Sequence, residues 1–503
     1  MTNVTGASHR IAVYLASGVL LLGPTVLAFY AGGFFWKQRV IAAGVAWALV
    51  AVATLTCRVV VPRVISARVA IATLVALTLW AALSMFVFAP LSTPAFDVVV
   101  LLLLFSGWLI AAAAFLRAAA VQISVEPVLA LGTLVVVGYA LLTRLLPSVI
   151  PSSNSALAFG RLEQPLTYWN ALGTIAGVGL LLCVRIAGDS RRPKLMRASA
   201  CAGSVPMALA IYLTYSRGAI AAVVFGLAIL LCVRWTRSQI QSAVLCCVAG
   251  VIACVVASGF DGISLVEQSR AVRNGQGAAV LGISLAIMAL AAVAQQMLSN
   301  RSAQRSEIKS LEGWMKVTIA LVAIAVVIGG GALVSSEKSA VGANPSRLVS
   351  SESARYSYWD VALNGWTQRP VQGIGVGGFE ALWLAQRTEA TPARNPHSLF
   401  IQTLSELGLI GIALLIAFVA AIVAAGRRAR SGDPALVAGW IAVLGVVIFH
   451  SGLDWVWQMP AVSLIALTLA GALIAEADNS QEAPLVNEMA VAAVSGLEQR
   501  SLD

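Results

Sequence analysis

The chain has 503 residues, of which 59% are hydrophobic and only 11% are charged, whereas soluble proteins carry about 25% charged residues. This composition excludes an ordinary soluble protein and, with a mean hydropathy of +0.88, indicates a polytopic membrane protein. The formal net charge of +11 does not predict a nucleic-acid partner, because the basic residues are divided among short loops on both sides of a membrane. The seven cysteines lie in or beside apolar runs without a CxxC pair, so we expect neither disulfides nor metal ligation.

Apolar runs of about twenty residues, the length that crosses a bilayer as a helix, recur from one end of the chain to the other. Fourteen candidate spans lie near residues 11–30, 40–57, 68–89, 98–116, 125–146, 166–185, 198–214, 219–233, 240–258, 277–298, 315–334, 398–425, 435–451 and 459–475. The sequence therefore predicts an all-α fold, a polytopic transmembrane helical bundle of about 12–14 spans.

The spans divide the chain into four parts. Residues 1–335 form an N-terminal bundle of about 11 spans, 336–397 a long extracytoplasmic loop with short helices, 398–475 the C-terminal spans, and 476–503 a cytoplasmic tail that we expect to be disordered. Most Lys and Arg residues of the short loops fall on one side if the N-terminus is cytoplasmic, as the positive-inside rule requires. We therefore expect a multi-pass protein of the cytoplasmic (inner or plasma) membrane.

This topology leaves several polar residues on the outer side, where charge bias does not explain them. Arg161 lies in the outer loop GRLEQPLTYWN, and Asp454 lies in the outer turn HSGLDWVWQMP. Arg217 interrupts two apolar runs in TYSRGA, so its guanidinium must reach the interface or face a polar cavity. It is either a snorkelling interfacial residue or a ligand for an anion, best of all a phosphate held by two parallel N–H bonds.

The long loop contains a helix, a turn and a second helix. In ARYSYWDVALNGW, which begins at Arg355, helical spacing places an apolar face that we expect to rest on the membrane surface: Tyr358, Val361, Ala362, Gly365 and Trp366. The segment PVQGIGVGGFE predicts a tight turn rather than a dinucleotide site, because no parallel-strand unit surrounds its glycines. FEALWLAQR predicts the second short helix.

His397 stands where this loop enters the next span, close to Arg394. Beyond it a polar stripe follows helical spacing and must face the bundle interior, since lipid cannot satisfy it: Ser398, Gln402, Ser405 and Glu406. Two interpretations remain open for His397, an interfacial hydrogen-bonded residue or a catalytic one. Glu406 is either a supporting site residue or a partner for a neighbouring helix.

Four segments in order resemble the superfamily of O-antigen ligases and O-antigen polymerases. PHSLFIQTLSELGLIG is similar to its His-containing span entry, TYSRGA to its Ser-Arg junction, ARYSYWDVALNGWTQRPVQGIGVGGF to its Arg…Trp…glycine-rich element, and LTYWNALG to its aromatic-Asn motif. The resemblance runs from about Arg161 to Trp457. One departure is Ser398, where the family often has Asn, so the way that the histidine is oriented is in question here.

The resemblance implies a glycosyltransferase that moves a glycan from an undecaprenyl-pyrophosphate-linked donor to a glycan, lipid or protein acceptor outside the cytoplasm. It implies no cofactor, metal or nucleotide sugar. Arg217 and Arg355, with Arg161, would bind the pyrophosphate, and His397 would act at the acceptor; Arg394, Gln402, Glu406 and Asp454 are possible supporting residues. A pyrophosphate leaving group needs charge stabilisation, and the sequence offers arginine rather than a DxD motif.

Neutral imidazole can accept a proton from an attacking sugar hydroxyl, and a single displacement would invert the anomeric centre. Ligase and polymerase activities remain open because no motif reports on the acceptor. A polytopic transporter or lipid-linked glycan flippase is the alternative from another class, although the outer clustering of the arginines and His397 does not suggest a midplane site.

Overall fold

The computed structural model describes residues 2–57, 59–88, 92–151, 155, 158–264, 269–302, 355–387, 390 and 392–500. Its α-helices are α1 (Thr2–Ala28), α2 (Trp36–Thr56), α3 (Ile65–Val87), α4 (Thr93–Phe115), α5 (Ala119–Leu145), α6 (Trp169–Gly188), α7 (Lys194–Thr214), α8 (Arg217–Val233), α9 (Arg237–Ser258), α10 (Asp261–Ser264), α11 (Arg270–Ser302), α13 (Arg355–Gln368), α14 (Phe379–Gln386), α15 (Leu399–Ala429), α16 (Pro434–Leu453) and α17 (Pro460–Arg500). Short 3₁₀ helices, η1 (Ala31–Gly33) and η4 (Trp455–Gln458), complete the described elements.

The prediction of an all-α polytopic bundle is confirmed. Among the described residues, 12 helices are long and apolar enough to cross a membrane, and each coincides with a span predicted from the sequence. The span predicted near 219–233 is the shorter apolar helix α8, with 17 residues. The span predicted near 315–334 lies outside the described residues.

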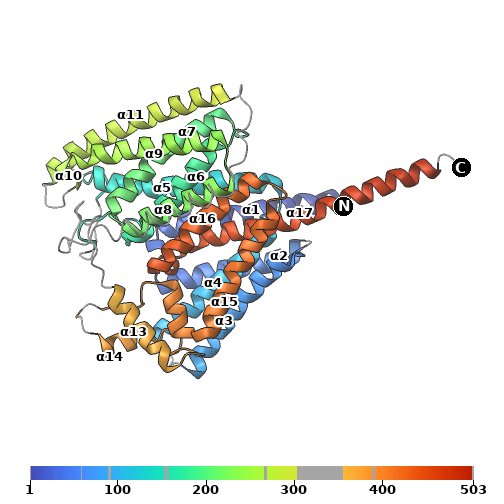
Figure 1. Ribbon diagram of the computed structural model, residues 1–503, viewed down its shortest axis with the longest axis horizontal. Coiled ribbons are helices and arrows are strands. Elements are labelled where there is room, and N and C mark those ends of the chain that lie inside the picture. Colours follow the sequence, from blue (N-terminus) through green and yellow to red (C-terminus); the bar gives the residue numbers. More distant parts are fainter. Residues whose placement is uncertain are drawn as a thin grey trace.

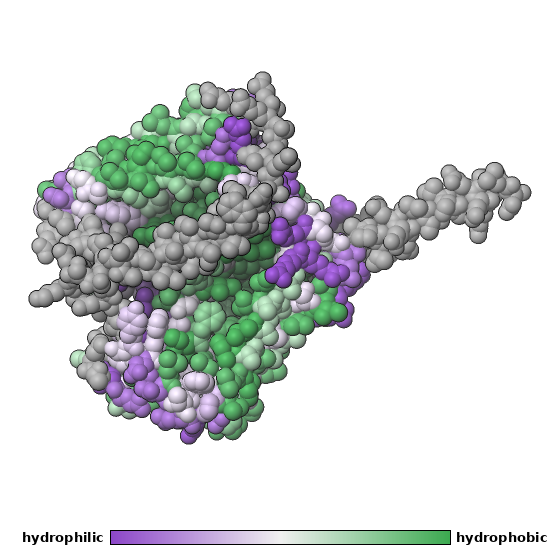
Figure 2. Space-filling model, in the orientation of Figure 1, coloured by the Kyte–Doolittle hydropathy of each residue, from purple (hydrophilic) through white to green (hydrophobic). Residues whose placement is uncertain are grey.

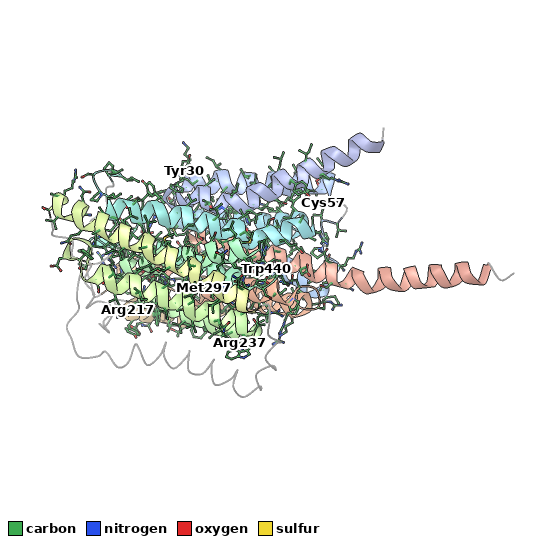
Figure 3. All side chains as sticks on the ribbon, turned by 90° about the horizontal axis from the view of Figure 1, so that it is seen from above. Tyr30, Cys57, Arg217, Arg237, Met297 and Trp440 are labelled. Carbon is green, nitrogen blue, oxygen red and sulfur yellow. The ribbon has the colours of Figure 1, made fainter. Side chains whose placement is uncertain are left out.

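The long helices lie roughly alongside one another, and the short helices α13 and α14 project from one end of the bundle (Figure 1). The beginning of α1 and the protruding part of α17 lie at the opposite end (Figure 1). Figure 3 shows Arg217 towards one end of the bundle, with Arg237 and Cys57 displaced towards the other. The helix α8 therefore starts at the end that carries α13.

Helices α6 and α17 form the centre of the bundle, because their most apolar windows are 100% and 94% buried. Small residues let the helices approach closely, as is usual between membrane helices. Gly173 and Gly177 lie one turn apart on α6, and a Cβ atom added to them would come 2.9 Å from Ala219 and 2.7 Å from Val223 of α8. This contact fixes the first turns of α6 and α8 against each other.

Apolar side chains cover much of the outside of the bundle. Exposed large hydrophobic residues follow one face of α9, namely Val244, Val248, Val251, Ile252 and Val255. In Figure 2 hydrophobic residues cover the helices that are in view, whereas hydrophilic residues gather over the α13–α14 segment and beside the start of the protruding part of α17. This distribution fits a bundle surrounded by lipid with polar ends.

The short helices of the loop were predicted correctly, but their environment was not. The apolar face of α13 does not rest on a membrane surface: Tyr358 and Ala362 are buried in a cluster with Phe379 and Trp383 of α14. Tyr358 and Trp383 pack edge to face, with ring centroids 4.7 Å apart. Burying these rings against each other removes the apolar face from solvent without any lipid.

The segment after Ala475 also differs from the expectation of a disordered tail. The backbone of α17 continues as helix from Pro460 to Arg500. The tail is rich in Ala, Leu, Glu and Gln, which all have high helix propensity, so its composition supports continuation of the preceding span.

Candidate functional site

Asp454, directly after α16, is the centre of a polar cluster at the end of the bundle where α8 begins. Its carboxylate is completely buried. It accepts hydrogen bonds from the Tyr168 hydroxyl (2.6 Å), the Asn170 amide (2.7 Å) and the Trp455 backbone N–H (2.8 Å). Arg355, the first residue of α13, donates to the same carboxylate in an ion pair. One carboxylate thus joins α6, α13 and the α16–η4 turn.

The charges of this cluster are set by their neighbours. Burial alone would raise the pKa of Asp454, but Arg355 and the two nearby histidines hold that pKa below its usual value. Burial and the negative charge of Asp454 raise the pKa of the Tyr168 phenol well above its ordinary value. Asp454 is therefore an ionised acceptor and Tyr168 a protonated donor at neutral pH.

His397 lies beside this cluster in a constrained backbone conformation. Its φ of 55° is in the left-handed region, which non-glycine residues adopt rarely. The Asn395 side chain accepts a hydrogen bond from the His397 N–H at 3.2 Å, and the Asn395 carbonyl oxygen lies 3.1 Å from Nδ1. A carbonyl oxygen can only accept, so Nδ1 carries the hydrogen and the lone pair of the neutral ring is at Nε2.

Two aromatic rings and two opposite charges surround the His397 imidazole. Its ring centroid is 5.2 Å from that of Tyr358 and 6.5 Å from that of Trp455. Burial lowers the pKa of His397, and Arg355 lowers it further, whereas Asp454 raises it; the net shift is downward. The imidazole is therefore neutral at physiological pH, with a lone pair at Nε2 that can accept a proton.

His450 lies between this cluster and the first turn of α8, which begins with Arg217. It is fully buried in the last turn of α16, and its Nδ1 is 2.7 Å from the Thr174 hydroxyl of α6. On the other side of the ring, a Cβ atom added to Gly218 would lie 2.6 Å from Nε2. His450 therefore packs directly against the first turn of α8, beside Arg217. It is a core residue rather than an interfacial one.

Arg161 is linked to Asp454 through aromatic rings. Its guanidinium lies 3.6 Å from the ring centroid of Trp169, a close cation–π contact. The Trp169 ring is in turn 4.9 Å from the ring of Tyr168, which donates to Asp454. The side chain of Arg161 is buried, and its Nε donates to the Ala158 carbonyl at 2.8 Å.

Comparison with known families addresses the resemblance directly. Residues 269–416 match the family model of the O-antigen ligases. The family resemblance is confirmed. The match supports an O-antigen ligase-like membrane glycosyltransferase, and it includes Arg355 and His397 but not Arg161, Arg217 or Asp454. No protein in the comparison with curated sequences matches the chain.

The O-antigen ligase-like segment also contains the predicted polar stripe, which contacts the glycine-rich turn. Glu406 accepts a hydrogen bond from Gly377 N–H at 2.9 Å, and Gln402 donates to Glu406 at 3.3 Å. Gln458 of η4 donates to Gln402 at 3.1 Å. The stripe therefore joins α15 to the turn after α13 and to η4, which fits the interpretation of Glu406 as a partner for a neighbouring segment.

Close backbone contact explains why this turn is rich in glycine. Gly373 has a φ of +77°, and a Cβ atom there would come 2.5 Å from the Glu406 carbonyl. Opposite it, Gly408 has a φ of +66° inside α15 and would place a Cβ atom 2.2 Å from the Val371 carbonyl oxygen. Side chains at either position would push the turn away from α15.

The structure thus brings His397, Arg355 and Asp454 together. Arg161 is connected to this cluster through Trp169 and Tyr168, and Arg217 adjoins Gly218, which packs against His450. Arg394 is apart: it is exposed, and its Nε lies 3.7 Å from Glu380 of α14. In the described part of the chain, no group of three or more His, Cys, Asp or Glu residues is arranged to hold a metal ion.

Tyr168, Asn170, Thr174 and His450 were not predicted as site residues. A signal for two of them is visible in the sequence, because Asn170 and Thr174 lie one turn apart in an otherwise apolar span. Polar groups at that spacing within a span must face a protein partner rather than lipid.

Proposed function

We propose that this protein transfers a glycan from undecaprenyl pyrophosphate to an acceptor hydroxyl at the outer face of the cytoplasmic membrane. The observation that carries the proposal is the juxtaposition of His397, with its basic Nε2, and the Asp454–Arg355 ion pair. A base and a cation for the leaving group are the two agents that glycosyl transfer from a pyrophosphate requires.

Arg355 and Arg217, with Arg161, bind the pyrophosphate. Arginine suits this role because its planar guanidinium makes paired hydrogen bonds to phosphate oxygens. Arg217 stands at the first position of α8, where the positive end of the helix dipole also favours an anion. No divalent cation takes part in the proposed reaction.

His397 acts as the base. Its Nε2 takes the proton of the acceptor hydroxyl while the hydroxyl oxygen attacks C1 of the donor sugar. The bond between C1 and the phosphate oxygen breaks, its electron pair stays on that oxygen, and undecaprenyl pyrophosphate leaves. The configuration at C1 is inverted because the reaction is a single displacement.

Asp454 acts through its neighbours rather than on substrate. Its negative charge raises the pKa of His397, so it stabilises the imidazolium that forms in the transition state. Its ion pair fixes Arg355 at the start of α13. Asn395 orients the ring from the residues before His397, a role that removes the need for the Asn that the family often has at the position of Ser398.

A transfer assay tests the proposal. Purified full-length protein in lipid nanodiscs is mixed with an undecaprenyl-pyrophosphate-linked glycan extracted from the source cells. We expect glycosidic bond formation and release of undecaprenyl pyrophosphate, unchanged by EDTA. Growth of the lipid-linked chain identifies a polymerase, and transfer to an added lipid or protein fraction identifies a ligase. Lipid movement across vesicles without a new bond would contradict the proposal and favour a flippase.

Thiol labelling tests the proposed orientation. Thr367 on α13 and Ser190 after α6 are exposed residues, so a cysteine at either position is accessible from its own side. In intact cells an impermeant thiol reagent should label Thr367→Cys and not Ser190→Cys, with the wild-type chain as the background control. The reverse pattern would put the site on the cytoplasmic side.

A further inference from the structure

The outward face of α13 carries aromatic and polar side chains that the proposed reaction does not use. Tyr356 is 67% and Leu363 39% exposed, and they share this face, at helical spacing, with Trp359, Asp360 and Asn364. We name these five residues the α13 ledge. The opposite face of α13 is buried against α14, and this packing holds the backbone of the ledge in place.

The aromatic end of the ledge is fixed next to the proposed base. The Trp359 indole N–H donates to the carbonyl oxygen of Pro396 at 2.9 Å, and Pro396 directly precedes His397. The Tyr356 ring packs edge to face against Trp359, with ring centroids 5.7 Å apart. Tyr356 also directly follows Arg355 in the sequence, so the aromatic pair adjoins a proposed phosphate ligand as well as the residue before the proposed base.

The other end of the ledge carries two polar residues beside Leu363. Asp360 is exposed, and Asn364 donates to its carboxylate at 3.3 Å. Sugars combine an apolar face of C–H groups with a rim of hydroxyls. An aromatic ring offers a flat apolar surface with a negative face to the C–H groups, and carboxylate and amide groups pair with the hydroxyls.

We propose that the α13 ledge binds the glycan of the donor lipid, with its first pyranose rings against Tyr356 and Trp359 and a following sugar at Asp360 and Asn364. This proposal rests on the proposed function, because it takes the pyrophosphate to lie at Arg355. The glycan then runs along α13, which rises about 12 Å between Tyr356 and Asn364, enough for a short oligosaccharide. The ledge thereby selects donors by their sugars.

Anchoring in the membrane interface is the competing role, since Tyr and Trp are enriched where bilayers meet water. The exposed Asp360, one position after Trp359 and one turn from Tyr356, favours the glycan, because an acidic side chain on the same face opposes insertion among lipids. The two roles make different demands on the side chain at position 356. An interfacial anchor needs apolar area, whereas sugar stacking needs a flat ring.

Three variants at Tyr356, in the full chain in nanodiscs, test the ledge with two probes. One probe is the extracted undecaprenyl-pyrophosphate-linked glycan, and the other is undecaprenyl pyrophosphate without sugar. We expect Tyr356→Ala and Tyr356→Leu to weaken binding of the glycan lipid about three- to tenfold, the range of a lost aromatic contact. Tyr356→Phe should bind it nearly as wild type does, and all three should bind the sugar-free lipid unchanged.

Each other outcome contradicts either the proposed binding of glycan by the α13 ledge or the proposed function on which it rests. Recovery of glycan-lipid binding by Tyr356→Leu would show that apolar area suffices, as for a membrane anchor. Equal weakening for both lipids would show that Tyr356 supports the fold or Arg355 rather than the sugars. Unchanged binding in Tyr356→Ala would contradict glycan binding by the ledge alone, provided that the wild type transfers glycan. A wild-type chain that binds neither lipid would contradict both the proposed function and glycan binding by the ledge.

Discussion

The helices α6 and α16 lie side by side and carry a buried charged cluster at each end, and the two clusters are built differently. Where α6 ends and α16 begins, Arg185 lies 3.5 Å from Glu126 and 3.0 Å from Asp189. Arg191 lies 3.0 Å from Asp189 and 2.8 Å from Asp433. Burial would raise the pKa of Asp189, but these arginines hold it well below its usual range.

At the other end of the same helices, Asp454 is surrounded by neutral donors, one arginine and two histidines. A neutral imidazole can accept a proton, whereas Asp189, Arg191 and Asp433 of the Arg185 cluster stay charged at neutral pH. A set of permanent opposite charges fixes helices in one arrangement. At the other end, the neutral imidazoles near Asp454 can accept and release protons. The Arg185 cluster is therefore structural and the Asp454 cluster functional. Variants at the Arg185 end should lose stability, and variants at the Asp454 end should lose activity.

The largest effect is expected from His397→Ala. Loss of a positioned base should lower turnover by a factor on the order of 10²–10⁴, while binding of undecaprenyl pyrophosphate persists because the arginines remain. Single-turnover transfer and lipid binding measured in parallel check this. A fall in acceptor affinity alone, at an unchanged maximal rate, would show that His397 binds the acceptor and is not the base.

At the opposite end, Arg185→Leu should unfold the protein more easily without changing its chemistry. Glu126 and Asp189 would stay buried without their central cation, a change that typically costs about 3–5 kcal/mol. Lys194→Ala is the control, because this exposed residue only donates a hydrogen bond to Asn300 at 2.7 Å, and surface substitutions of this kind change stability by only about 0.5 kcal/mol. Denaturant unfolding in detergent should show this order, with activity per folded molecule unchanged. Reduced activity in folded Arg185→Leu would end the distinction between the two clusters.

Much of the fold follows from local sequence, and most of the site does not. Apolar runs and the Gly- and Pro-containing breaks between them locate the helices, because each span must satisfy its own backbone in lipid. The central position of Asp454 in the site depends on its contact with Asn170, 284 positions earlier in the chain. No local sequence pattern predicts a contact between residues so far apart. The apolar face of α13 was assigned to the membrane for the same reason, since its partner Trp383 lies on another helix.

Asp454→Asn should have the next largest effect on activity. The amide still accepts hydrogen bonds but loses the charge that pairs with Arg355. Hydrogen bonds to charged groups contribute about 1.5–3 kcal/mol, so we expect a loss of roughly ten- to hundredfold in turnover. The matched change at the other end, Asp433→Asn, should leave turnover unchanged. Equal effects of the two substitutions would mean that Asp454 is only a structural residue.

A smaller effect is expected from Gly218→Ala. The new Cβ atom would lie 2.6 Å from His450 Nε2, so the first turn of α8 must move and carry Arg217 with it. We expect binding of undecaprenyl pyrophosphate to weaken on the order of tenfold, since small misplacements of a site residue are costly. Gly138→Ala is the control, because nothing lies within 4 Å of its Cβ position. His450→Ala should restore part of the binding in the Gly218→Ala chain, and equal binding by both glycine variants would contradict this packing.

The smallest effect concerns the pH dependence of transfer. Burial and Arg355 lower the pKa of His397 below its ordinary value of 6.5, and the base must be unprotonated. Activity should therefore be at its plateau at neutral pH and fall as pH decreases through that lowered pKa, so the loss at pH 6.5 is less than about twofold.

Asp454 raises the pKa of His397, so Asp454→Asn should move the acid limb of the pH profile to lower pH while it lowers the plateau. The residual activity of His397→Ala should lack this limb. An acid limb that stays in place in Asp454→Asn would show that the two groups are not coupled, and the contrast between the ends of α6 and α16 would then rest on geometry alone.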